Sequence, residues 1–466
     1  MSKIIKWALI ASFAVAIVIG LALKFSKSAQ NIALDKISDA AVKRIASNPD
    51  AAGTVAADFI NIPIEAREIS DGIWQATGVA NTHIITTDDG DVMFDTGLVT
   101  QATKQKKALE TAIPDIDLSH IIISHSHADH SGGTNVWHRK GMEIVTHSEF
   151  PEEQRYLTEL QDYFWHRNKT LFPFMPETPP KIGLLAYGGI QPSWEVANGT
   201  PLKFSQGGVD FEVWALPGAE GLDNLVLWLP QKRILFSGDF FGPIFPQFPN
   251  VFTMRGEKIR KPIEYINSLE VVLALQPEMI VPSHRDPIIG KANILNDIAK
   301  MRDATRYVHD QTIAGMNAGK TVEQLMAEIQ LPPELALTQE HGKVSWAVKS
   351  IWEYYATWFH FDKTTELYSV PANSIYADLV EMSGSDPIVN KASAYAMTEP
   401  LKALHLVDIV LENEELNKGA LQVRKTALLE LLELAKAGDK NSYEIYWLNF
   451  RLRDTNAKLN FENSEP

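Results

Sequence analysis

The sequence predicts an α/β domain followed by an all-α domain, and a change of texture indicates where they divide. From residue 63 to 290, short β-prone runs such as HIIISH and RILFSGD are separated by Gly, Asp and Pro and alternate with helical stretches, which is typical of layered α/β domains. From residue 291 to 466 the β-prone runs stop and stretches with 3.6-residue periodicity follow. With 466 residues and 45% hydrophobic composition, the chain is long enough for two domains.

The N-terminal residues are apolar and are flanked by lysines. Residues 7–23 form an uninterrupted apolar run, which predicts an export signal or a short membrane anchor within residues 1–28. A buried core helix is the alternative, but such a helix is seldom apolar on every face. A polar, Ala-rich linker helix is predicted over 29–62. We therefore expect an exported protein, either periplasmic or anchored to the membrane and facing the periplasm.

Composition narrows the chemistry that the chain can perform. The formal net charge is −15 and no basic stripe recurs, which argues against a nucleic-acid partner and favours a small substrate. The chain has no cysteine, so neither a disulfide nor a thiolate ligand can form. Any protein ligand of a metal must therefore be His, Asp or Glu.

Two further patterns concern the sheet and the helical domain. Asp89-Gly90 lies between two β-prone runs and predicts a hairpin, so the sheet should begin with antiparallel strands. Aromatic residues gather between 346 and 361, more than one amphipathic face needs. A helix core is the favoured interpretation, and a subunit interface or an apolar substrate wall is the alternative.

Four side chains able to bind metal follow the apolar run that ends near residue 123. His125 and His127 should lie on the same side of an extended strand end, whereas Asp129 and His130 should face a second ion as the chain bends into a helix. Gly132-Gly133 permits a tight turn with close backbone approach. A histidine-rich surface loop is the alternative, although this spacing after a buried strand is hard to obtain by chance.

At these residues the sequence resembles the metallo-β-lactamase superfamily, whose fold is a four-layer αββα sandwich. The resemblance implies that Asp95, in VMFDTG, supports the ligands, that Asp239, in RILFSGD, bridges two ions, and that His284, in VPSHRDP, is the last ligand. A histidine satisfied within the core is the alternative for His284. Two divalent ions, zinc or another metal, are the implied cofactors.

Most members of the superfamily carry His after a Pro-Gly turn, where this chain has Glu220 in PGAEG. Alkylsulfatases carry a glutamate there, so Glu220 is the predicted carboxylate ligand of the first ion; an exposed loop acid is the alternative. Residues 291–466 resemble the helical dimerisation domain of alkylsulfatases, which implies a homodimer. Known members also carry a C-terminal domain of the sterol-carrier type, which we expect to be absent.

The resemblance extends to residues that would contact the substrate. Arg255, in TMRG, stands where alkylsulfatases carry an arginine able to grip sulfate, with Asn250 as the matching amide donor. A surface or ion-paired arginine is the alternative. Alkylsulfatases have His where this chain has Pro249, so the proton donor is expected elsewhere, at His341 or Tyr187.

These residues predict a dinuclear-metal hydrolase that cleaves an alkyl sulfate or a related anionic ester with a metal-activated water. Asp129 counts among the predicted catalytic residues as well as among the ligands. Hydrolysis of a lactone, phosphodiester or β-lactam by the same metal pair is one alternative. A binding or scaffolding protein that has lost activity is the other.

Overall fold

The computed structural model describes residues 62–172, 175, 189–218, 220–251 and 253–461, together with a few single residues between 26 and 43. The predicted export signal or anchor (1–28) and the predicted linker helix (29–62) lie almost entirely outside the described residues, and so does Tyr187. Within the part of the chain that is described, no helix is both long and apolar enough to span a membrane.

The chain divides into two compact units. The first contains the described residues of three segments, Met1–Trp165, Phe174–Phe245 and Ile263–Arg302. The second contains those of His166–Pro173, Pro246–Pro262 and Asp303–Pro466. Arg255 and Asn250 therefore fold with the helical unit, although they precede it in the sequence.

The first sheet of the first unit has seven strands whose spatial order equals their order in the chain. Its first four strands pair antiparallel, and the pairings from β4 to β7 are parallel. The hairpin predicted at Asp89-Gly90 joins β3 to β4 and is confirmed. The strands are β1 (Ala66–Ser70), β2 (Ile73–Ala76), β3 (Thr82–Ile85), β4 (Asp91–Phe94), β5 (Leu118–Ile122), β6 (Glu143–His147) and β7 (Trp194–Val196).

The second sheet has six strands in the order β13-β12-β11-β10-β9-β8. Its pairings are antiparallel except for β11 with β12, which are connected through helix α9 (Pro262–Leu275). A parallel pair needs such a crossover. The strands are β8 (Leu202–Gln206), β9 (Val209–Ala215), β10 (Leu225–Leu229), β11 (Ile234–Gly238), β12 (Met279–Pro282) and β13 (Ile288–Ile289).

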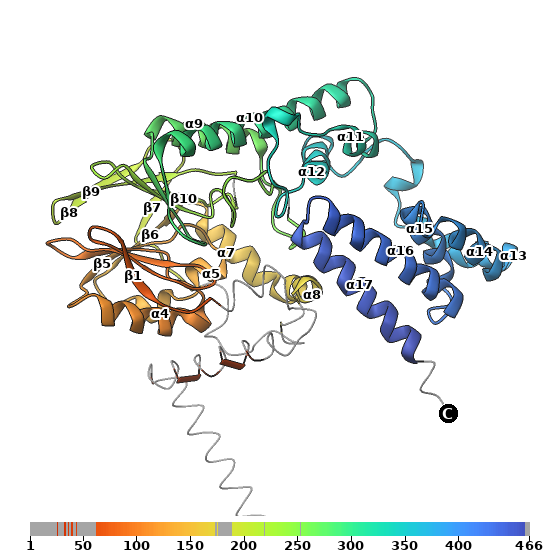
Figure 1. Cartoon of the computed structure of the whole chain (residues 1–466), viewed down its shortest axis with the longest axis horizontal. Coiled ribbons are helices and arrows are strands. Elements are labelled where there is room, and N and C mark those ends of the chain that lie inside the picture. Colours follow the sequence, from red (N-terminus) through yellow and green to blue (C-terminus); the bar gives the residue numbers. More distant parts are fainter. Residues whose placement is uncertain are drawn as a thin grey trace, which may run out of the picture. The chain divides into compact units, whose positions relative to one another are not determined.

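The two sheets share one apolar core. Phe94 of the first sheet and Phe236 of the second lie with ring centroids 5.6 Å apart, and both are fully buried. A second apolar cluster lies on the other face of the first sheet, under helix α4 (Val99–Ala112). In Figure 1, α4 covers one sheet and α9 the other, which confirms the predicted αββα sandwich. Strands β10 and β11 are buried at every residue, as expected for strands covered on both faces.

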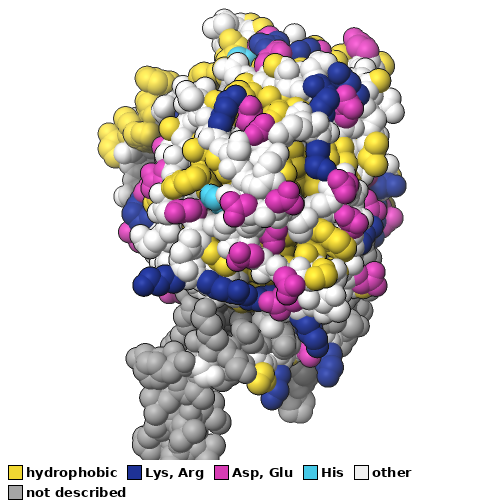
Figure 2. Space-filling view, turned by 90° about the vertical axis from the view of Figure 1, so that its left-hand side faces the viewer, with side chains coloured by type: hydrophobic (Ala, Val, Ile, Leu, Met, Phe, Trp, Pro, Cys, Tyr) yellow, Lys and Arg dark blue, Asp and Glu magenta, His cyan; other side chains and the backbone are white. Residues whose placement is uncertain are grey.

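Short helices connect the strands of the first unit, and the second unit is helical, as predicted. The second unit has apolar clusters of its own, one of them joining α10 (Lys291–Asn317) to α12 (Val344–Ala356). Figure 2 draws the side of the molecule that lies on the left in Figure 1. On this face, Lys and Arg side chains are interspersed with Asp and Glu side chains. The remaining helices are α5 (Ala128–Ser131), α6 (Thr134–Trp137), α7 (Phe150–Glu159), α8 (Gln161–Leu171), α10 (Lys291–Asn317), α11 (Val322–Glu328), η1 (Pro333–Leu335), α12 (Val344–Ala356), η2 (Thr364–Leu367), η3 (Ala372–Ile375), α13 (Tyr376–Ser383), α14 (Ser385–Tyr395), α15 (Pro400–Leu411), α16 (Lys418–Ala437) and α17 (Ser442–Phe461).

Candidate metal centre

The H-x-H-x-D-H motif lies where the chain leaves β5 and turns into α5. His127 is the N-cap residue of α5, with an extended ψ of 145°. Its carbonyl oxygen accepts the N–H groups of His130 and Ser131 at 3.1 and 3.0 Å. The turn therefore places His125 and His127 on extended backbone and puts Asp129 and His130 in the first turn of the helix, as the spacing predicts.

Two groups of potential ligand atoms meet beside this turn. The first group consists of His125, His130 and Asp239, and the second of Asp129, His130 and His284. Within each group the ligand atoms all lie within 4.8 Å of one another. Since His130 belongs to both groups, the two clusters adjoin. Predicted ligands from three segments of the chain are thus brought together.

Distances between individual atoms show how close the predicted ligands lie to one another. His284 Nε2 lies 3.2 Å from Asp239 Oδ2 and 3.7 Å from an oxygen of Asp129. His125 Nε2 lies 2.8 Å from His127 Nδ1, which places His127 against the first group. Glu220 is buried, 5% exposed, but it belongs to neither of the two groups found among the described residues. Its role as a ligand stays a prediction.

Asp95 holds this cluster from behind. Its Oδ1 accepts the N–H of Ser124 at 2.8 Å, and its Oδ2 accepts the hydroxyls of Ser124 and Ser283 at 2.9 and 2.8 Å. Oδ2 also lies 2.8 Å from His130 Nδ1. A carboxylate on Nδ1 keeps the proton there and leaves Nε2 with a lone pair for a metal. The sequence assigned this supporting role to Asp95, and the geometry fits it.

His284 is oriented in the same manner. Its Nδ1 lies 2.6 Å from the carbonyl oxygen of Val79, so Nδ1 carries the proton and Nε2 faces the carboxylates of Asp239 and Asp129. A backbone carbonyl and a carboxylate are the usual partners behind metal-binding histidines. Two ring nitrogens on different segments therefore point into one place.

The charges in the cluster compensate one another. Burial opposes a charge on His130, but the carboxylates of Asp239, Asp129 and Asp95 outweigh burial and raise its pKa well above the usual range. Burial likewise opposes the charge of Asp239, yet His284 and His130 hold the pKa of this carboxyl well below its usual range. Carboxylates and imidazoles that are held this close attract a divalent cation strongly.

Two buried atoms support a metal at this place. Asp239 Oδ1 and His130 Nε2 are both buried and have no hydrogen-bond partner among the described residues. Buried polar atoms are nearly always satisfied by a partner. Since nitrogen and oxygen atoms of this kind are the ligands that zinc takes in catalytic sites, the residues present fit a divalent metal.

The helical unit brings together two other predicted residues. Asn250 Nδ2 lies 3.3 Å from His341 Nε2, and the two residues are 5% and 9% exposed. The segment after His341 passes directly over the segment before Asn250. A Cβ on Gly342 would lie 2.4 Å from the carbonyl oxygens of both Phe248 and Pro249, so only glycine fits here.

Arg255 lies in a chain of ion pairs within the same unit. Its Nε is 3.0 Å from Glu257, whose other oxygen is 2.8 Å from Arg260. Arg260 in turn donates to the carbonyl oxygen of Asn250 at 2.7 Å. The guanidinium of Arg255 is thus held by a carboxylate, and its side chain stays 23% exposed.

Comparison with known proteins agrees with both parts of the chain. Residues 76–284 match the metallo-beta-lactamase superfamily, and residues 321–449 match the alkyl sulfatase dimerisation family. Each match covers one of the two predicted domains. The predicted resemblance to alkylsulfatases is therefore confirmed.

Two relatives illustrate the extent of this alkylsulfatase likeness. One linear primary-alkylsulfatase from a Pseudomonas strain is 34% identical over 179 residues, covering 37% of this chain and 34% of that enzyme. Another, from Pseudomonas sp., is 24% identical over 417 residues, covering 83% of this chain. The chain spans about 60% of the length of the second enzyme.

A solved structure shares the fold. The stereoselective inverting sec-alkylsulfatase from Pseudomonas sp. superposes with a TM-score of 0.72 at 19% identity. The match covers 92% of this chain and 70% of that one. The likeness of fold thus extends over both parts of the chain.

One buried acid of the metallo-β-lactamase domain was missed by the sequence analysis. Asp223 is 1% exposed, and its Oδ2 accepts the N–H of Ser126, the residue between His125 and His127, at 2.8 Å. Burial, reinforced by the carboxylate of Glu153, raises the pKa of Asp223 to about 7. The signal that could have found it is an acid two residues before the apolar strand β10.

Proposed function

We propose that this chain is a metal-dependent hydrolase of alkyl sulfates or closely related anionic esters. The observation that carries the proposal is the pair of ligand groups around His130, in a chain that also contains an alkylsulfatase dimerisation domain. The metallo-β-lactamase domain supplies the clustered ligands, and the second domain narrows the substrate class. The named relatives are alkylsulfatases, which supports a sulfate ester in preference to a lactone or a β-lactam.

Seven residues would hold two divalent ions. When bound, such ions polarise the ester and lower the pKa of a water molecule toward neutrality. His125, His127 and Glu220 would hold the first ion. Asp129, His130 and His284 would hold the second, and Asp239 would supply a further carboxylate to the pair.

The protein residues have separate tasks in this proposal. Asp95 keeps the proton of His130 on Nδ1, and the carbonyl of Val79 does the same for His284. Asp129 has the most exposed side chain in its ligand group, 26%, against 0% for His130 and 7% for His284. It is therefore the ligand of this group best placed to contact an incoming water or ester.

Further residues complete the proposed machinery. Arg255 would bind the sulfate with its guanidinium, and His341 would donate a proton to the departing alcohol. The 3.3 Å contact between Asn250 and His341 supports a joint role for this pair. Tyr187 remains the other proposed proton donor.

The assembly and location of the protein also belong to the proposal. The match to a dimerisation family supports a homodimer. The apolar run at residues 7–23, with lysines on both sides, supports export to the periplasm.

Turnover and metal content should be measured together on the purified protein. Dodecyl sulfate would be compared with a lactone, a phosphodiester and a β-lactam, and His130→Ala would be compared with His120→Phe. His120 is a matched control, because it lies on the same strand–turn segment but stacks on Phe204, with ring centroids 4.7 Å apart. We expect sulfate release with bound metal, both lost in His130→Ala and kept in His120→Phe. Bound metal without sulfate release would reject the substrate class and keep the metal site.

A further inference from the structure

Segment 338–342 carries His341 and contacts two other parts of the helical unit. The first is the segment that precedes Asn250, where the N–H of Phe248 donates to the carbonyl oxygen of Thr338 at 2.9 Å. The second is the start of α17, much further along the chain. The position of His341 is thus set by contacts with residues that are distant from it in the sequence.

Asn441, the residue before α17, binds the backbone of this segment with its side-chain amide. Its Nδ2 donates to the carbonyl oxygen of Gln339 at 2.8 Å and to that of His341 at 3.1 Å, so both hydrogens of the amide are used. The N–H of the next residue, Ser442, donates to the carbonyl oxygen of Glu340 at 2.8 Å. Three successive carbonyl oxygens are therefore held by two successive residues, and the side chain of Asn441 is fully buried.

The same side chain also caps the helix. Oδ1 of Asn441 accepts the N–H of Glu444 at 3.3 Å, and the carbonyl oxygen of Asn441 accepts the N–H of Ile445 at 3.1 Å. These are the bonds of a helix N-cap residue. Serine or aspartate can cap a helix equally well, but neither has an NH₂ group. The amide nitrogen of Asn441 therefore serves the segment of His341 and not the helix.

The imidazole of His341 is held as well as its backbone. The ring of Tyr443, in the first turn of α17, lies with its centroid 5.3 Å from that of His341, and Tyr443 is 4% exposed. Nε2 of His341 lies 3.3 Å from Nδ2 of Asn250. A group that gives a proton in a reaction must be held in one orientation, because rate depends steeply on the placement of reacting groups. The contacts with α17 and with Asn250 supply such an orientation.

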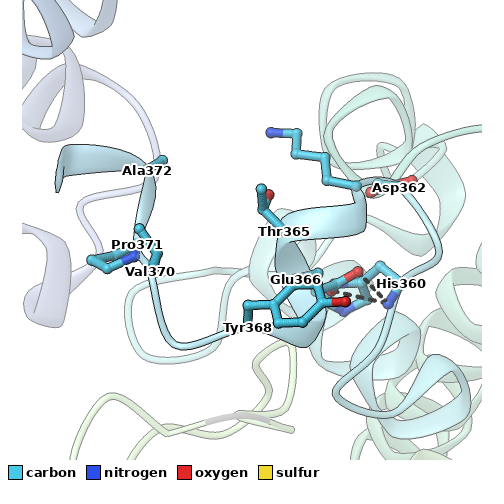
Figure 3. A pocket seen from close by; sticks show the side chains of 9 residues that line it. His360, Asp362, Thr365, Glu366, Tyr368, Val370, Pro371 and Ala372 are labelled. Atoms are coloured by element: carbon cyan, nitrogen blue, oxygen red, sulfur yellow. Dashed lines mark hydrogen bonds and ion pairs between the residues drawn. The ribbon is translucent and has the colours of Figure 1, made fainter. Parts of the chain in front are cut away.

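His360 of the same unit is held in a different way. Its Nε2 lies 2.9 Å from Glu353 and its Nδ1 lies 2.8 Å from Glu366. Figure 3 shows His360 and Glu366 joined beside a cavity of about 360 Å³. These two glutamates are 7 and 6 residues away in the sequence. Asn441 instead reaches the backbone of His341 from 100 residues away.

We propose that Asn441 is a positioning residue for His341, so that the start of α17 takes part in delivering a proton to the departing alcohol. This inference rests on the proposed function, in which His341 is the proton donor. The bond between sulfur and the alcohol oxygen breaks, its electron pair stays on the alcohol oxygen, and that oxygen takes the proton of His341. The attacking water gives its oxygen to sulfur and a proton back to His341.

A displaced proton donor should affect one class of ester more than another. An alkoxide is a strong base and needs a proton as it leaves, whereas 4-nitrophenolate is a weak base and leaves without one. Loss of the Asn441 amide should therefore slow the hydrolysis of dodecyl sulfate and spare that of 4-nitrophenyl sulfate. KM should change little, because the side chain of Asn441 is fully buried and bonds to the chain itself.

The test variant is Asn441→Ser, and the matched control is Asn417→Ser. Asn417 is the N-cap residue of α16 and accepts the N–H of Ala420 at 2.9 Å, but its Nδ2 donates to Glu414. Since serine is a good N-cap residue, both variants keep the start of a helix and differ in what the lost amide held.

Values of kcat and KM should be measured with both esters for the wild type, the two variants, His341→Gln and the double variant of His341→Gln with Asn441→Ser. Circular dichroism and metal content show whether each protein is folded. Asn441→Asp, which also keeps the cap, takes the place of Asn441→Ser if the latter does not fold.

For Asn441→Ser we expect kcat with dodecyl sulfate to fall about 100-fold, and kcat with 4-nitrophenyl sulfate to stay within about threefold of the wild type. Asn417→Ser should match the wild type with both esters. In the His341→Gln background the Asn441 substitution should have no further effect, because a residue that acts through another does not add to its loss. An equal loss with both esters, or a further loss in the double variant, would overturn the proposal.

Two other outcomes separate this inference from the proposed function. If His341→Gln kept the wild-type rate with dodecyl sulfate, another residue would be the proton donor, and the role of Asn441 would be rejected while the hydrolase remained. If the wild type released sulfate from neither ester, the substrate class of the proposed function would be rejected, and the role of Asn441 with it.

Discussion

Replacing Asp95 by Asn tests whether the hydrogen bonds behind the metal centre control metal binding. Asp95 has a φ of 57°, a conformation that Asn tolerates well, so the backbone should remain unchanged. The carboxylate accepts from Ser124 through Oδ1 and from His130 and two hydroxyls through Oδ2. An amide has only one acceptor oxygen. Whichever way it is turned, its NH₂ group meets either the N–H of Ser124 or the N–H of His130.

The expected loss follows from the bond that the amide weakens. A hydrogen bond to a charged group contributes about 1.5–3 kcal/mol. Removing the partner behind a metal-binding histidine costs about 10–100-fold in metal affinity, which corresponds to ~1.4–2.8 kcal/mol. We therefore expect the metal dissociation constant of Asp95→Asn to rise at least tenfold.

The affinity should be measured by competition with a chromophoric chelator. Asp91→Asn is the matched control, because Asp91 begins the strand β4 that Asp95 follows, is 6% exposed, and accepts the backbone N–H groups of Thr87 and Asp117 instead of a ligand. If Asp95→Asn bound metal as tightly as Asp91→Asn and the wild type, the supporting role of Asp95 would be refuted.

Three other predictions concern His83, His360 and Asp223. Burial lowers the pKa of His83 to about 4. Above pH 6.5 this shift does not affect stability, because His83 is neutral in the folded and the unfolded chain alike. As pH falls from 6.5 to 4 only the unfolded chain gains the proton, so the free energy of unfolding falls by about 3 kcal/mol. Urea unfolding of the wild type and His83→Gln at pH 7.5 and 4.5 should show this difference, and parallel pH dependences would contradict it. The hydrogen bond with Glu353 and the neighbouring Glu366 raise the pKa of His360. The ion pairs of His360 with these two glutamates therefore stabilise the fold fully below pH 6.5, and their contribution weakens as pH rises through the raised pKa. The difference in melting temperature between the wild type and Glu366→Gln should become smaller from pH 6 to pH 9. A constant difference would show that the ion pair between His360 and Glu366 does not stabilise the fold. Asp223→Ala leaves the buried N–H of Ser126 without an acceptor and should weaken metal binding about tenfold, whereas Asp223→Asn, which keeps an acceptor oxygen, should largely restore it in the same chelator assay.

The sequence was sufficient to predict the layered fold and the clustering around α5. Strands β10 and β11 are buried on both faces, so their apolar runs were unmistakable. The spacing of His125, His127 and His130 left little freedom, because a strand end followed by a helix turn brings them together whatever surrounds them.

Contacts between distant segments could not be predicted in the same way. Asp223 supports the ligand turn through a backbone N–H, and backbone groups leave no mark in a sequence. His360 forms ion pairs with two glutamates on separate helices, Glu353 and Glu366. Nothing in the spacing of these glutamates distinguishes them from ordinary surface acids. The family resemblance indicated Glu220, but its backbone and side chain place it outside the two ligand groups found among the described residues.

The close passage of Gly342 over Phe248 and Pro249 limits how this protein can change over generations. No larger residue fits at position 342, so the gap between the two backbone segments cannot be widened or narrowed by a single substitution there. Side chains on either side of this passage can still be replaced, because the two carbonyl oxygens restrict only position 342. Pro249 and His341 are two such side chains, and each lies next to a backbone whose path the glycine fixes.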